Sequence, residues 1–414
     1  MTVTVLAVEG RAATPTAEHE SSLGELLELA RLSSPSARLA TLRLAYGDAA
    51  RASAEPLFPD NPTLELGVGP RLEGGDYDVF ATFSQPVEVA GERGLRITLA
   101  ARFRERLEAE LAASAWDLRR EVTLSYHTAV IAREGAELAD RLLEFAGDLL
   151  AIARRRRAAG DSTSIELRIA EIEHARAREA KLAADQALRS ARVALAEVTG
   201  SSIDAPPNVP RGLEPPRTIP SLARLLRLTE AHPALRARRL ATGEAHAHKA
   251  LADREAWPTP VLGAQVARES ASEGPPSYVV LGTIAAPLPF WQRNQGERAR
   301  ARAAVDVAEA KEISTARALR SRVVRTHGEL SVAVARLAIF TSSVAPSLED
   351  NLALLRRGFE AGELSVLALA TARERFLEAQ RDALSAYADC ARARSELESA
   401  AGAELSLLDE VGNE

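Results

Sequence analysis

The chain has 414 residues, of which 27% are charged, and its formal net charge is −6. This acidic balance argues against a nucleic-acid-binding protein, which needs a basic face. Its single cysteine, Cys390, excludes an internal disulfide framework and a cysteine-based zinc site, and no apolar run reaches the length of about 18 residues that marks a transmembrane helix.

The N-terminal segment, residues 1–21, starts with a short apolar stretch that has no basic region before it. A secretory signal peptide combines a basic start, an apolar segment and a small-residue cleavage site. A signal peptide is therefore not evident. We expect this segment to be the remnant of one or to be disordered.

Residues 22–200 are predicted to form one structural repeat, because helical periodicity and strand-like alternation follow each other between turn residues. Its elements are a helix, a strand pair, a long proline-free helix, a turn and a second long helix, at about 22–54, 60–87, 93–157, Gly160 and 163–198. The sequence thus predicts a long helical hairpin after a β-hairpin.

The second half repeats this plan. Residues 201–220 contain six of the 21 prolines and are predicted to be an extended linker. Residues 221–402 form the second repeat, and residues 403–414 form a C-terminal tail. The five elements recur at about 219–255, 259–287, 294–358, Gly362 and 364–401.

A tandem duplication is indicated by four landmarks that recur in the same order. Proline and glycine are common, so a single match means little, but four ordered matches with little drift are hard to obtain by chance. The offset drifts only from 198 to 202 residues across the four pairs, which are Pro35 and Pro233, Pro62 and Pro260, Pro86 and Pro287, and Gly160 and Gly362.

The first pair of strand candidates alternates in polarity. Leu64, Leu66 and Val68 share one face of the first strand, whereas Phe80 breaks the alternation of the second. A two-stranded hairpin is not stable alone, so strands from several copies closing one barrel are the simplest arrangement. Alternation over about 9–11 residues is expected of a membrane strand. A soluble hairpin packed on a helix is the alternative.

Glycines and arginines mark the ends of the long helices. Gly160 and Gly362 are expected to adopt the left-handed conformation that ends a helix. Arg154–Arg157 precede the first glycine, and Arg356 and Arg357 precede the second. A cation near a helix C-terminus gains about 0.3–1 kcal/mol, which is a sufficient structural reason for these arginines. The functional interpretation is an ion pair within the tip or with a partner.

Four prolines, Pro62, Pro86, Pro260 and Pro287, bound the predicted strands. Proline lacks the N–H group that a sheet requires, so it belongs at strand ends. We expect these residues to mark the junctions between barrel strands and helices.

Nothing in the sequence builds a metal or catalytic site. His246 and His248 are two residues apart, which places them on different sides of a helix. Glu171 and His174 have the spacing of a helical-bundle metal site, but the matching segment of the second half has no histidine. We therefore expect no metal, no cofactor and no enzymatic activity.

Several short motifs occur in order along the two halves. They are Ser34-Pro35, Asn61-Pro62-Thr63-Leu64, Phe-Ser-Gln-Pro-Val-Glu-Val-Ala-Gly-Glu-Arg over 83–93, Ala-Pro-Leu-Pro-Phe-Trp-Gln-Arg-Asn-Gln-Gly over 286–296, and the turns 157–162 and 359–365. No single motif is specific, but the duplicated set is. With it the chain resembles the TolC-like outer-membrane efflux proteins over about residues 22–402. It is most similar to their heavy-metal resistance branch (cobalt–zinc–cadmium and copper–silver efflux).

This resemblance implies a mainly α fold with a small β part. Tandem-duplicated helical hairpins would form a periplasmic α-barrel, and four strands per chain would contribute to a trimeric, twelve-stranded β-barrel in the outer membrane of a Gram-negative cell. The chain would be the passive exit duct of a tripartite efflux pump for metal cations or small toxic compounds. Its implied partners are two further copies, a periplasmic adaptor protein, an inner-membrane pump of the resistance-nodulation-division type and outer-membrane lipid.

The resemblance also assigns roles at the tips. The adaptor would contact Arg156, Arg157, Gly160, Asp161, Ser162, Arg356, Arg357, Gly362, Glu363 and Ser365. Glu166 and Glu363 are candidates for the pore constriction, because carboxylate rings favour cations. Ala368 and Thr371 stand where some relatives carry aspartates, so such a ring is incomplete here. The alternative to a channel is a soluble helical-hairpin scaffold or adaptor, which leaves the duplicated strand pairs without a use.

Overall fold

The protein divides into two compact units, and each takes segments from both halves of the sequence. The computed structural model describes residues 19–70, 77–212, 219–269, 275–343, 348–361 and 363–405. Unit 1 comprises Met1–Leu39, Ser114–Thr229 and Leu319–Glu414, and unit 2 comprises Ala40–Ala113 and Glu230–Ala318. The compact units therefore do not coincide with the two sequence repeats.

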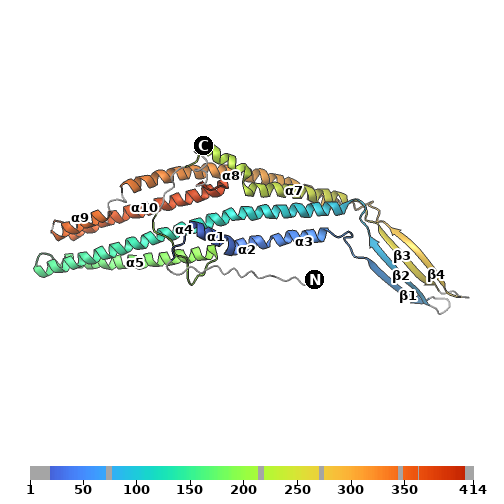
Figure 1. Cartoon of the computed structure of the whole chain (residues 1–414), viewed down its shortest axis with the longest axis horizontal. Coiled ribbons are helices and arrows are strands. Elements are labelled where there is room, and N and C mark those ends of the chain that lie inside the picture. Colours follow the sequence, from blue (N-terminus) through green and yellow to red (C-terminus); the bar gives the residue numbers. More distant parts are fainter. Residues whose placement is uncertain are drawn as a thin grey trace. The chain divides into compact units, whose positions relative to one another are not determined.

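The first predicted helix, about 22–54, is interrupted in the structure. It consists of α1 (Leu23–Ser33), α2 (Pro35–Leu42) and α3 (Leu44–Ala54) (Figure 1). Pro35 causes the first break, because it lacks the N–H group that a continuing helix needs. Ser34 caps the new helix, since its hydroxyl accepts a hydrogen bond from the Ala37 N–H at 3.1 Å. The prediction of one continuous helix is wrong here.

Four antiparallel strands form one sheet in unit 2, in the order β1-β2-β3-β4 (Figure 1). Their bounds are Thr63–Pro70 for β1, Tyr77–Pro86 for β2, Val261–Glu269 for β3 and Ser277–Ala285 for β4. Both predicted strand pairs are present. The central pairing, between β2 and β3, joins the two halves of the sequence. Two separate hairpins in the sequence thus become one sheet.

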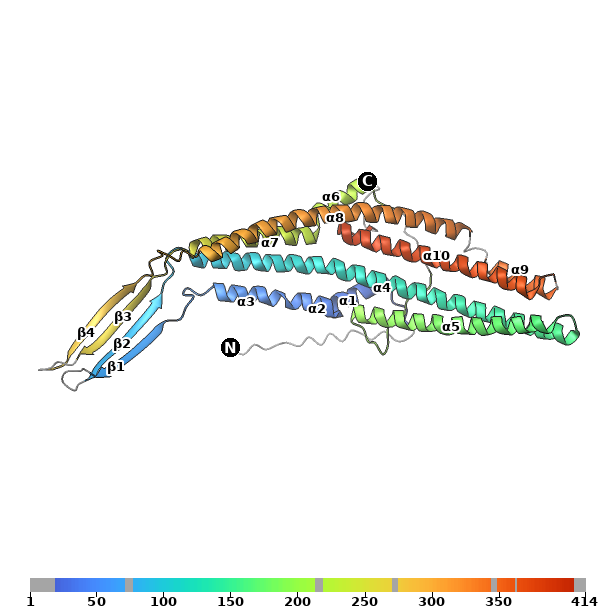
Figure 2. The ribbon, with the colours of Figure 1, turned by 180° about the vertical axis from the view of Figure 1, so that it is seen from behind.

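Two long helices, α4 (Glu92–Ala159) and α5 (Ser164–Thr199), form the hairpin predicted for the first half. Figure 2 shows α5 beside the last part of α4, where Lys181 bonds Asp140 at 2.7 Å. Gly200 ends α5 with φ of 73°, and a Cβ there would lie 2.3 Å from the Ser33 carbonyl oxygen, so this position requires glycine. None of the described helices combines enough length and apolar content to cross a membrane.

The second half differs from its prediction in one helix. The expected helix over about 219–255 is α6 (Leu222–Leu228), a 3₁₀ turn (Thr229–Ala231) and α7 (Pro233–Arg254). Pro233 starts the new helix, and the Nδ1 of His232 caps it by accepting from the Ala234 N–H at 3.0 Å. The later helices are α8 (Gln295–Ser343), α9 (Leu348–Glu360) and α10 (Val366–Ala401). The helix predicted at 294–358 includes residues 344–347, which lie outside the described residues.

Two of the apolar clusters in unit 1 each pack three helices together. The first packs α1, α4 and α5 around Val122 and Leu195, both fully buried. The second packs α6, α8 and α10 around Val323 and Leu397, also fully buried, and Ile131 of α4 packs against it. A buried Val or Leu side chain stabilises the fold by about 1.5–3 kcal/mol. Helix α4 is therefore common to the cores built by the two halves.

Candidate functional site

The sheet of unit 2 has one apolar face. Residues at alternate positions of a strand share a face, so the strand register decides which side chains lie next to one another. One row of neighbours is Leu66, Ala81, Val266 and Val280. The rows on either side are Leu64, Phe83, Ala264 and Gly282, and Val68, Val79, Arg268 and Tyr278. Across these three rows the only charged side chain is Arg268, near the loop end of β3.

This apolar face is open to the surroundings. Leu66 is 72% exposed, Val280 is 74% exposed and Ile284 is 79% exposed. Monomeric soluble proteins rarely expose a contiguous apolar surface, and such a surface marks contact with a partner or a membrane. The alternation predicted for the first strand pair is thus present, and the apolar face continues across β3 and β4.

Aromatic side chains lie near both ends of the strands. Tyr77 and Tyr278, at the loop end, are 58% and 72% exposed. Trp257, Phe290 and Trp291 follow or precede the strands at the helix end and are 60%, 66% and 84% exposed. Tyrosine and tryptophan are enriched where a membrane meets water, and membrane strands carry aromatic girdles at both interfaces. The placement of these residues fits that pattern.

The opposite face of the sheet is mainly polar along β1 and β2 and mixed along β3 and β4. Glu65, Thr82 and Gln265 lie side by side on it, followed by Leu281. Phe80 is the apolar residue of this face that the sequence indicated, and its ring fills the space over Gly67, where a Cβ would lie 2.1 Å from a ring carbon. Gly67 therefore allows an aromatic ring to lie against the neighbouring strand on the polar side.

The four junction prolines lie at or next to strand ends. Pro86 is the last residue of β2, and Pro62 directly precedes β1. Pro260 directly precedes β3, and its carbonyl oxygen accepts from the Val87 N–H at 2.9 Å. Pro287 follows β4 by two residues. These positions agree with the expected lack of a ladder donor.

The first predicted tip is a tight turn between α4 and α5. Gly160 has φ of 86°, the left-handed conformation expected of a residue that ends a helix. The Asp161 N–H donates to the Arg156 carbonyl oxygen at 2.9 Å, and the Gly160 N–H donates to the Arg157 carbonyl oxygen at 3.2 Å. The last carbonyl groups of α4 are thereby satisfied within the turn.

Glu166, a predicted constriction residue, caps the start of α5. The Thr163 hydroxyl accepts from the Glu166 N–H at 3.2 Å, and the Glu166 carboxylate accepts from the Thr163 N–H at 3.1 Å. This reciprocal pair is a capping box, which satisfies two helix-start donors. The carboxylate thus has a local role in the single chain.

The second predicted tip joins α9 to α10. The Glu363 N–H donates to the Gly358 carbonyl oxygen at 3.0 Å, and the Glu363 side chain is exposed. Ser365 caps α10 by accepting from the Ala368 N–H at 3.1 Å. Gly362, predicted as the helix stop, lies outside the described residues.

Arg156 links the two turns. Its guanidinium donates to the Phe359 carbonyl oxygen at 3.1 Å and lies over the Phe359 ring, 5.2 Å from the ring centre. Phe359 is 2% exposed and packs with Leu149 and Leu369. Arg156 therefore holds the ends of two hairpins together inside unit 1.

Two ion pairs connect the same hairpins further along. Arg356 bonds Asp148 at 2.8 Å on the surface. Arg373 of α10 bonds Glu173 of α5 at 2.7 Å, and their side chains are only 8% and 16% exposed. Removing one partner of a buried pair leaves an uncompensated charge, so the second pair is the stronger constraint.

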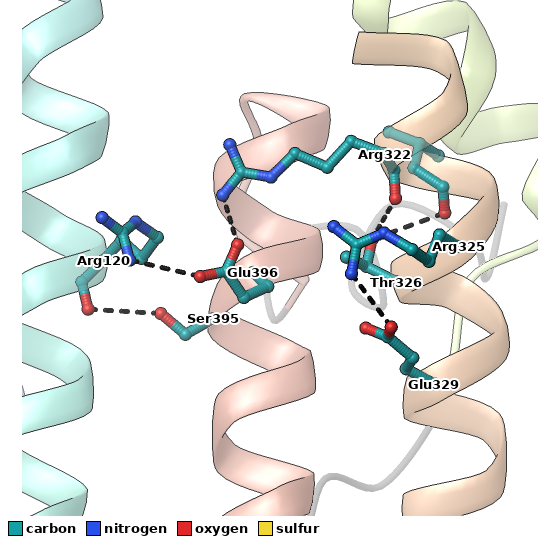
Figure 3. Close-up of polar contacts among 8 residues, drawn as sticks. Arg120, Arg322, Arg325, Thr326, Glu329, Ser395 and Glu396 are labelled. Atoms are coloured by element: carbon teal, nitrogen blue, oxygen red, sulfur yellow. Dashed lines mark hydrogen bonds and ion pairs between the residues drawn. The ribbon is translucent and has the colours of Figure 1, made fainter. Parts of the chain in front are cut away.

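A carboxylate with two arginines joins α4, α8 and α10 (Figure 3). One oxygen of Glu396 accepts from Arg120 at 3.2 Å, and the other accepts from Arg322. Ser395 donates to the Arg120 carbonyl oxygen at 3.4 Å. Burial alone raises the pKa of Glu396, but the hydrogen bonds and charges of Arg322 and Arg120 outweigh it, so the net pKa lies below its usual value. Glu396 is thus held as a carboxylate that ties the two halves together.

His127 forms a further link between the halves. The Tyr387 hydroxyl of α10 lies 3.1 Å from the His127 Nδ1 of α4. Burial, with a smaller contribution from the charge of Arg394, lowers the pKa of His127 to about 4. The ring is therefore neutral near pH 7, and its Nδ1 can accept a hydrogen bond from the tyrosine hydroxyl.

Histidines do not build a metal site in the described part of the chain. His246 lies 3.4 Å from Glu309, and His248 lies 3.7 Å from Glu297. Among the described residues, no group of three or more His, Cys, Asp or Glu side chains has an arrangement that could hold a metal ion.

Sequence analysis missed the charged residues that connect the halves. Arg120 and Glu396 are 276 positions apart, and each by itself resembles an ordinary charged residue on a long helix. Glu173 and Arg373 are 200 positions apart, which falls within the range of offsets between the repeats. A search for opposite charges at matching positions of the two repeats would have found this second pair.

The family described as outer membrane efflux protein, which is a transport family and not an enzyme family, matches residues 26–201 and 226–403. The cobalt-zinc-cadmium resistance protein CzcC of Cupriavidus metallidurans is 28% identical over 302 residues, which are 72% of this chain and 71% of that protein. These findings confirm the resemblance inferred from the sequence, including its heavy-metal resistance branch.

Solved structures of similar fold include CusC and the MtrE outer membrane channel of Neisseria gonorrhoeae in its open state. CusC is 16% identical with a TM-score of 0.72, over 93% of this chain and 92% of CusC. MtrE is 19% identical with a TM-score of 0.72, over 92% of this chain and 89% of MtrE. Identities this low speak to the fold alone. They confirm the predicted fold, which is mainly α with four strands.

Proposed function

Because the chain belongs to the outer membrane efflux protein family, we propose that it is the exit duct of a tripartite efflux pump. Three copies would assemble, and the four strands of each would close a twelve-stranded barrel in the outer membrane. Closure would pair the free edges of β1 and β4, which are otherwise templates for uncontrolled association. The duct would conduct passively from the periplasm to the exterior.

The observation that carries this proposal is the sheet of unit 2. Its register gathers most of the exposed apolar residues on one face and Glu65, Thr82 and Gln265, with Leu281 beside them, on the other. A transmembrane barrel requires this arrangement, with apolar side chains toward lipid and polar ones toward water. Exposed aromatic residues near both strand ends supply the anchors at the two interfaces.

The partners follow from the helical hairpins. We assign the two turns of unit 1 to the contact with a periplasmic adaptor protein, which would connect the duct to an inner-membrane pump of the resistance-nodulation-division type. Arg157, Asp161, Ser162, Arg357 and Glu363 would take part directly. Arg156 and Arg356 are bonded within the tip, so they would act by shaping the turns.

The cargo would be divalent metal cations. Support comes from the relative CzcC, whose name is that of a cobalt-zinc-cadmium resistance protein. Glu166 and Glu363 are assigned to the narrowest part of the pore, where carboxylates favour cations. Glu166 also caps α5 within the single chain, so its role in the pore is to be tested in the assembled trimer.

The two-repeat organisation of the chain belongs to the same proposal. The repeats would be 22–200 and 221–402, separated by the proline-rich segment 201–220. Each repeat would contribute two strands and one helical hairpin to the duct, with Pro62, Pro86, Pro260 and Pro287 at the junctions between barrel and helices.

Single-channel recording tests the proposal. The full chain would be expressed behind an outer-membrane signal sequence, purified in detergent and added to a planar lipid bilayer. Stepwise ion conductance is expected from a protein that fractionates with outer membranes as a trimer. A protein that remains in aqueous extracts and never conducts would favour the scaffold alternative.

A matched pair of variants tests the orientation of the strands. Leu66→Arg places a charge on the apolar face, where a cation near the bilayer midplane costs about 2–4 kcal/mol per chain, so insertion should fail. Thr82→Arg places the same side chain on the polar face of the neighbouring strand and should leave insertion intact. Equal behaviour of the two variants would contradict the assignment of lipid and water faces.

A further inference from the structure

The arginines of the two hairpin turns separate into two groups. Arg156 and Arg356 are bonded within unit 1, to the Phe359 carbonyl oxygen and to Asp148, respectively. Arg154 and Arg155 are exposed and have no bonded partner among the described residues. They lie five and six residues before Gly160, in the last two turns of α4.

Three more arginines near the turns lack a carboxylate partner within the described chain. Arg157 reaches only the Ser162 carbonyl oxygen at 3.4 Å, and Arg357 reaches only the Ala353 carbonyl oxygen of its own helix at 3.4 Å. Arg168, on the second turn of α5, is exposed. We call these five residues the free arginines: Arg154, Arg155, Arg157, Arg168 and Arg357.

The turns are basic in a chain that is acidic as a whole. Residues 154–168 and 355–365 together hold seven arginines and four carboxylates, which gives a local net charge of +3, while the chain carries −6. In a trimer, three such patches would lie at the same end of the assembly. A stabilising interaction with the helix C-terminus accounts for arginines in the last turn of α4, but it does not account for Arg168 near the start of α5, where a cation is disfavoured.

Apolar side chains are exposed beside these charges. Ile165 is 69% exposed at the start of α5, and Leu354 is 57% exposed on α9. An apolar centre within a charged surround is the usual composition of a protein–protein contact. Free cations around it complement a negative partner, which they attract during encounter and hold in one orientation.

We propose that the free arginines form a docking surface for an acidic surface of a partner protein. The inference rests on the proposed function and specifies the surface chemistry of the adaptor: carboxylates, with an apolar side chain for Ile165. Exposed charges are screened within roughly 8 Å at physiological ionic strength. The contact should therefore weaken steeply as salt is raised.

A labelled peptide of twenty glutamates is a direct probe of this surface. The detergent-purified full chain is titrated against it by fluorescence anisotropy in about 50 mM and 300 mM salt. We expect binding in low salt that falls at least tenfold in high salt, and at least tenfold weaker binding by the double variant Arg154→Glu/Arg155→Glu. A twenty-residue lysine peptide should not bind to either protein at this surface.

The matched control reverses the same charges elsewhere. Arg38 and Arg43 are exposed arginines far from the turns in sequence, and Arg38→Glu/Arg43→Glu should change binding by less than twofold. Equal losses in the two double variants would overturn the inference, because the peptide would then sense net charge alone. Conductance of the unaltered chain in planar bilayers is read separately, so failure of the duct and failure of the docking surface remain distinguishable.

The identity of the partner is tested in cells. A photo-crosslinking amino acid replaces Ile165, and the product is mapped by mass spectrometry. A cross-link to a protein segment with net negative charge supports the inference. A cross-link to a neutral or basic protein segment, or to an anionic phospholipid, overturns it.

Discussion

The two hairpin turns of unit 1 occupy matching places in the two halves, yet they are stabilised differently. Thr163 and Ser365 are 202 positions apart, and both hydroxyls cap the helix that follows. In the first turn the Glu166 carboxylate accepts a hydrogen bond from the Thr163 N–H, which completes the capping box. In the second turn the matching residue is Ala368, whose methyl group cannot accept such a hydrogen bond.

The second turn depends instead on the first hairpin. Arg156, Asp148 and Glu173 of the first half reach Phe359, Arg356 and Arg373 of the second half, respectively. The first turn thus has a complete capping box, whereas the second combines a single cap with contacts to the neighbouring hairpin. Loss of these contacts should therefore affect the second turn more than the first.

The largest expected effect comes from breaking the buried ion pair. Arg373→Ala leaves Glu173 with only its surface partner Arg176, and we expect a local loss of about 3 kcal/mol because a mostly buried charge is left poorly compensated. Hydrogen exchange of α10 peptides should accelerate roughly a hundredfold. Arg176→Ala is the control, because this side chain is 68% exposed and should change exchange by less than about fivefold.

The link between His127 and Tyr387 predicts a pH dependence. The folded pKa of His127, about 4, lies below its ordinary value of 6.5, so the unfolded chain binds the proton more readily. The contribution to stability is complete above about pH 6.5 and is lost as the pH falls toward 4, with a ceiling of about 3 kcal/mol. Thermal unfolding of His127→Gln should lose part of the acid-dependent decrease in Tm between these values. An unchanged decrease would contradict the assignment.

Removal of the two caps compares the turns directly. Thr163→Ala and Ser365→Ala each remove one hydroxyl acceptor and should each destabilise their helix start by about 1 kcal/mol. Thr163→Ala keeps the bond from the residue 163 N–H to the Glu166 carboxylate, so the first turn retains half of its capping box and should lose slightly less. Exchange rates of the amides at the N-termini of α5 and α10 measure both. A larger effect at Thr163 would refute the ranking.

The smallest effect is a gain. Ala368→Glu gives the second turn the residue that the first has at Glu166 and should complete its capping box. We expect the start of α10 to be stabilised by about 0.5 kcal/mol, seen as roughly twofold slower amide exchange. Ala368→Gln is an informative companion, because its side-chain oxygen can also accept a hydrogen bond from the Ser365 N–H but adds no charge to the tip.

The candidate site could be predicted from the sequence only where local chemistry decides it. Gly160 was identifiable as a helix stop because glycine adopts positive φ without strain. The strand faces were identifiable from the alternation at Leu64, Leu66 and Val68. The tip links were not, because an arginine that bonds another hairpin has the same local sequence context as a solvated one.

The breaks in the shorter helices show a limit of periodicity. The apolar pattern runs through Pro35 and Pro233, and it predicted continuous helices over about 22–54 and 219–255. The prolines end one helix and begin the next because they fit a first turn but not a helix interior. The caps at Ser34 and His232 were visible in the sequence and could have located both breaks.

The sequence by itself determined the elements that depend on period and turn chemistry: long helices, four strands in two pairs, and a plan repeated with an offset near 200 residues. Tertiary structure alone decided that β2 pairs with β3, that Phe80 lies over Gly67, and that Glu396 is shared by Arg120 and Arg322. The physical reason is the distance along the chain between the residues that interact. A period and a turn follow from neighbouring residues, whereas these contacts join segments far apart in the chain, and only the packed chain decides which of many equivalent charges and strand edges meet.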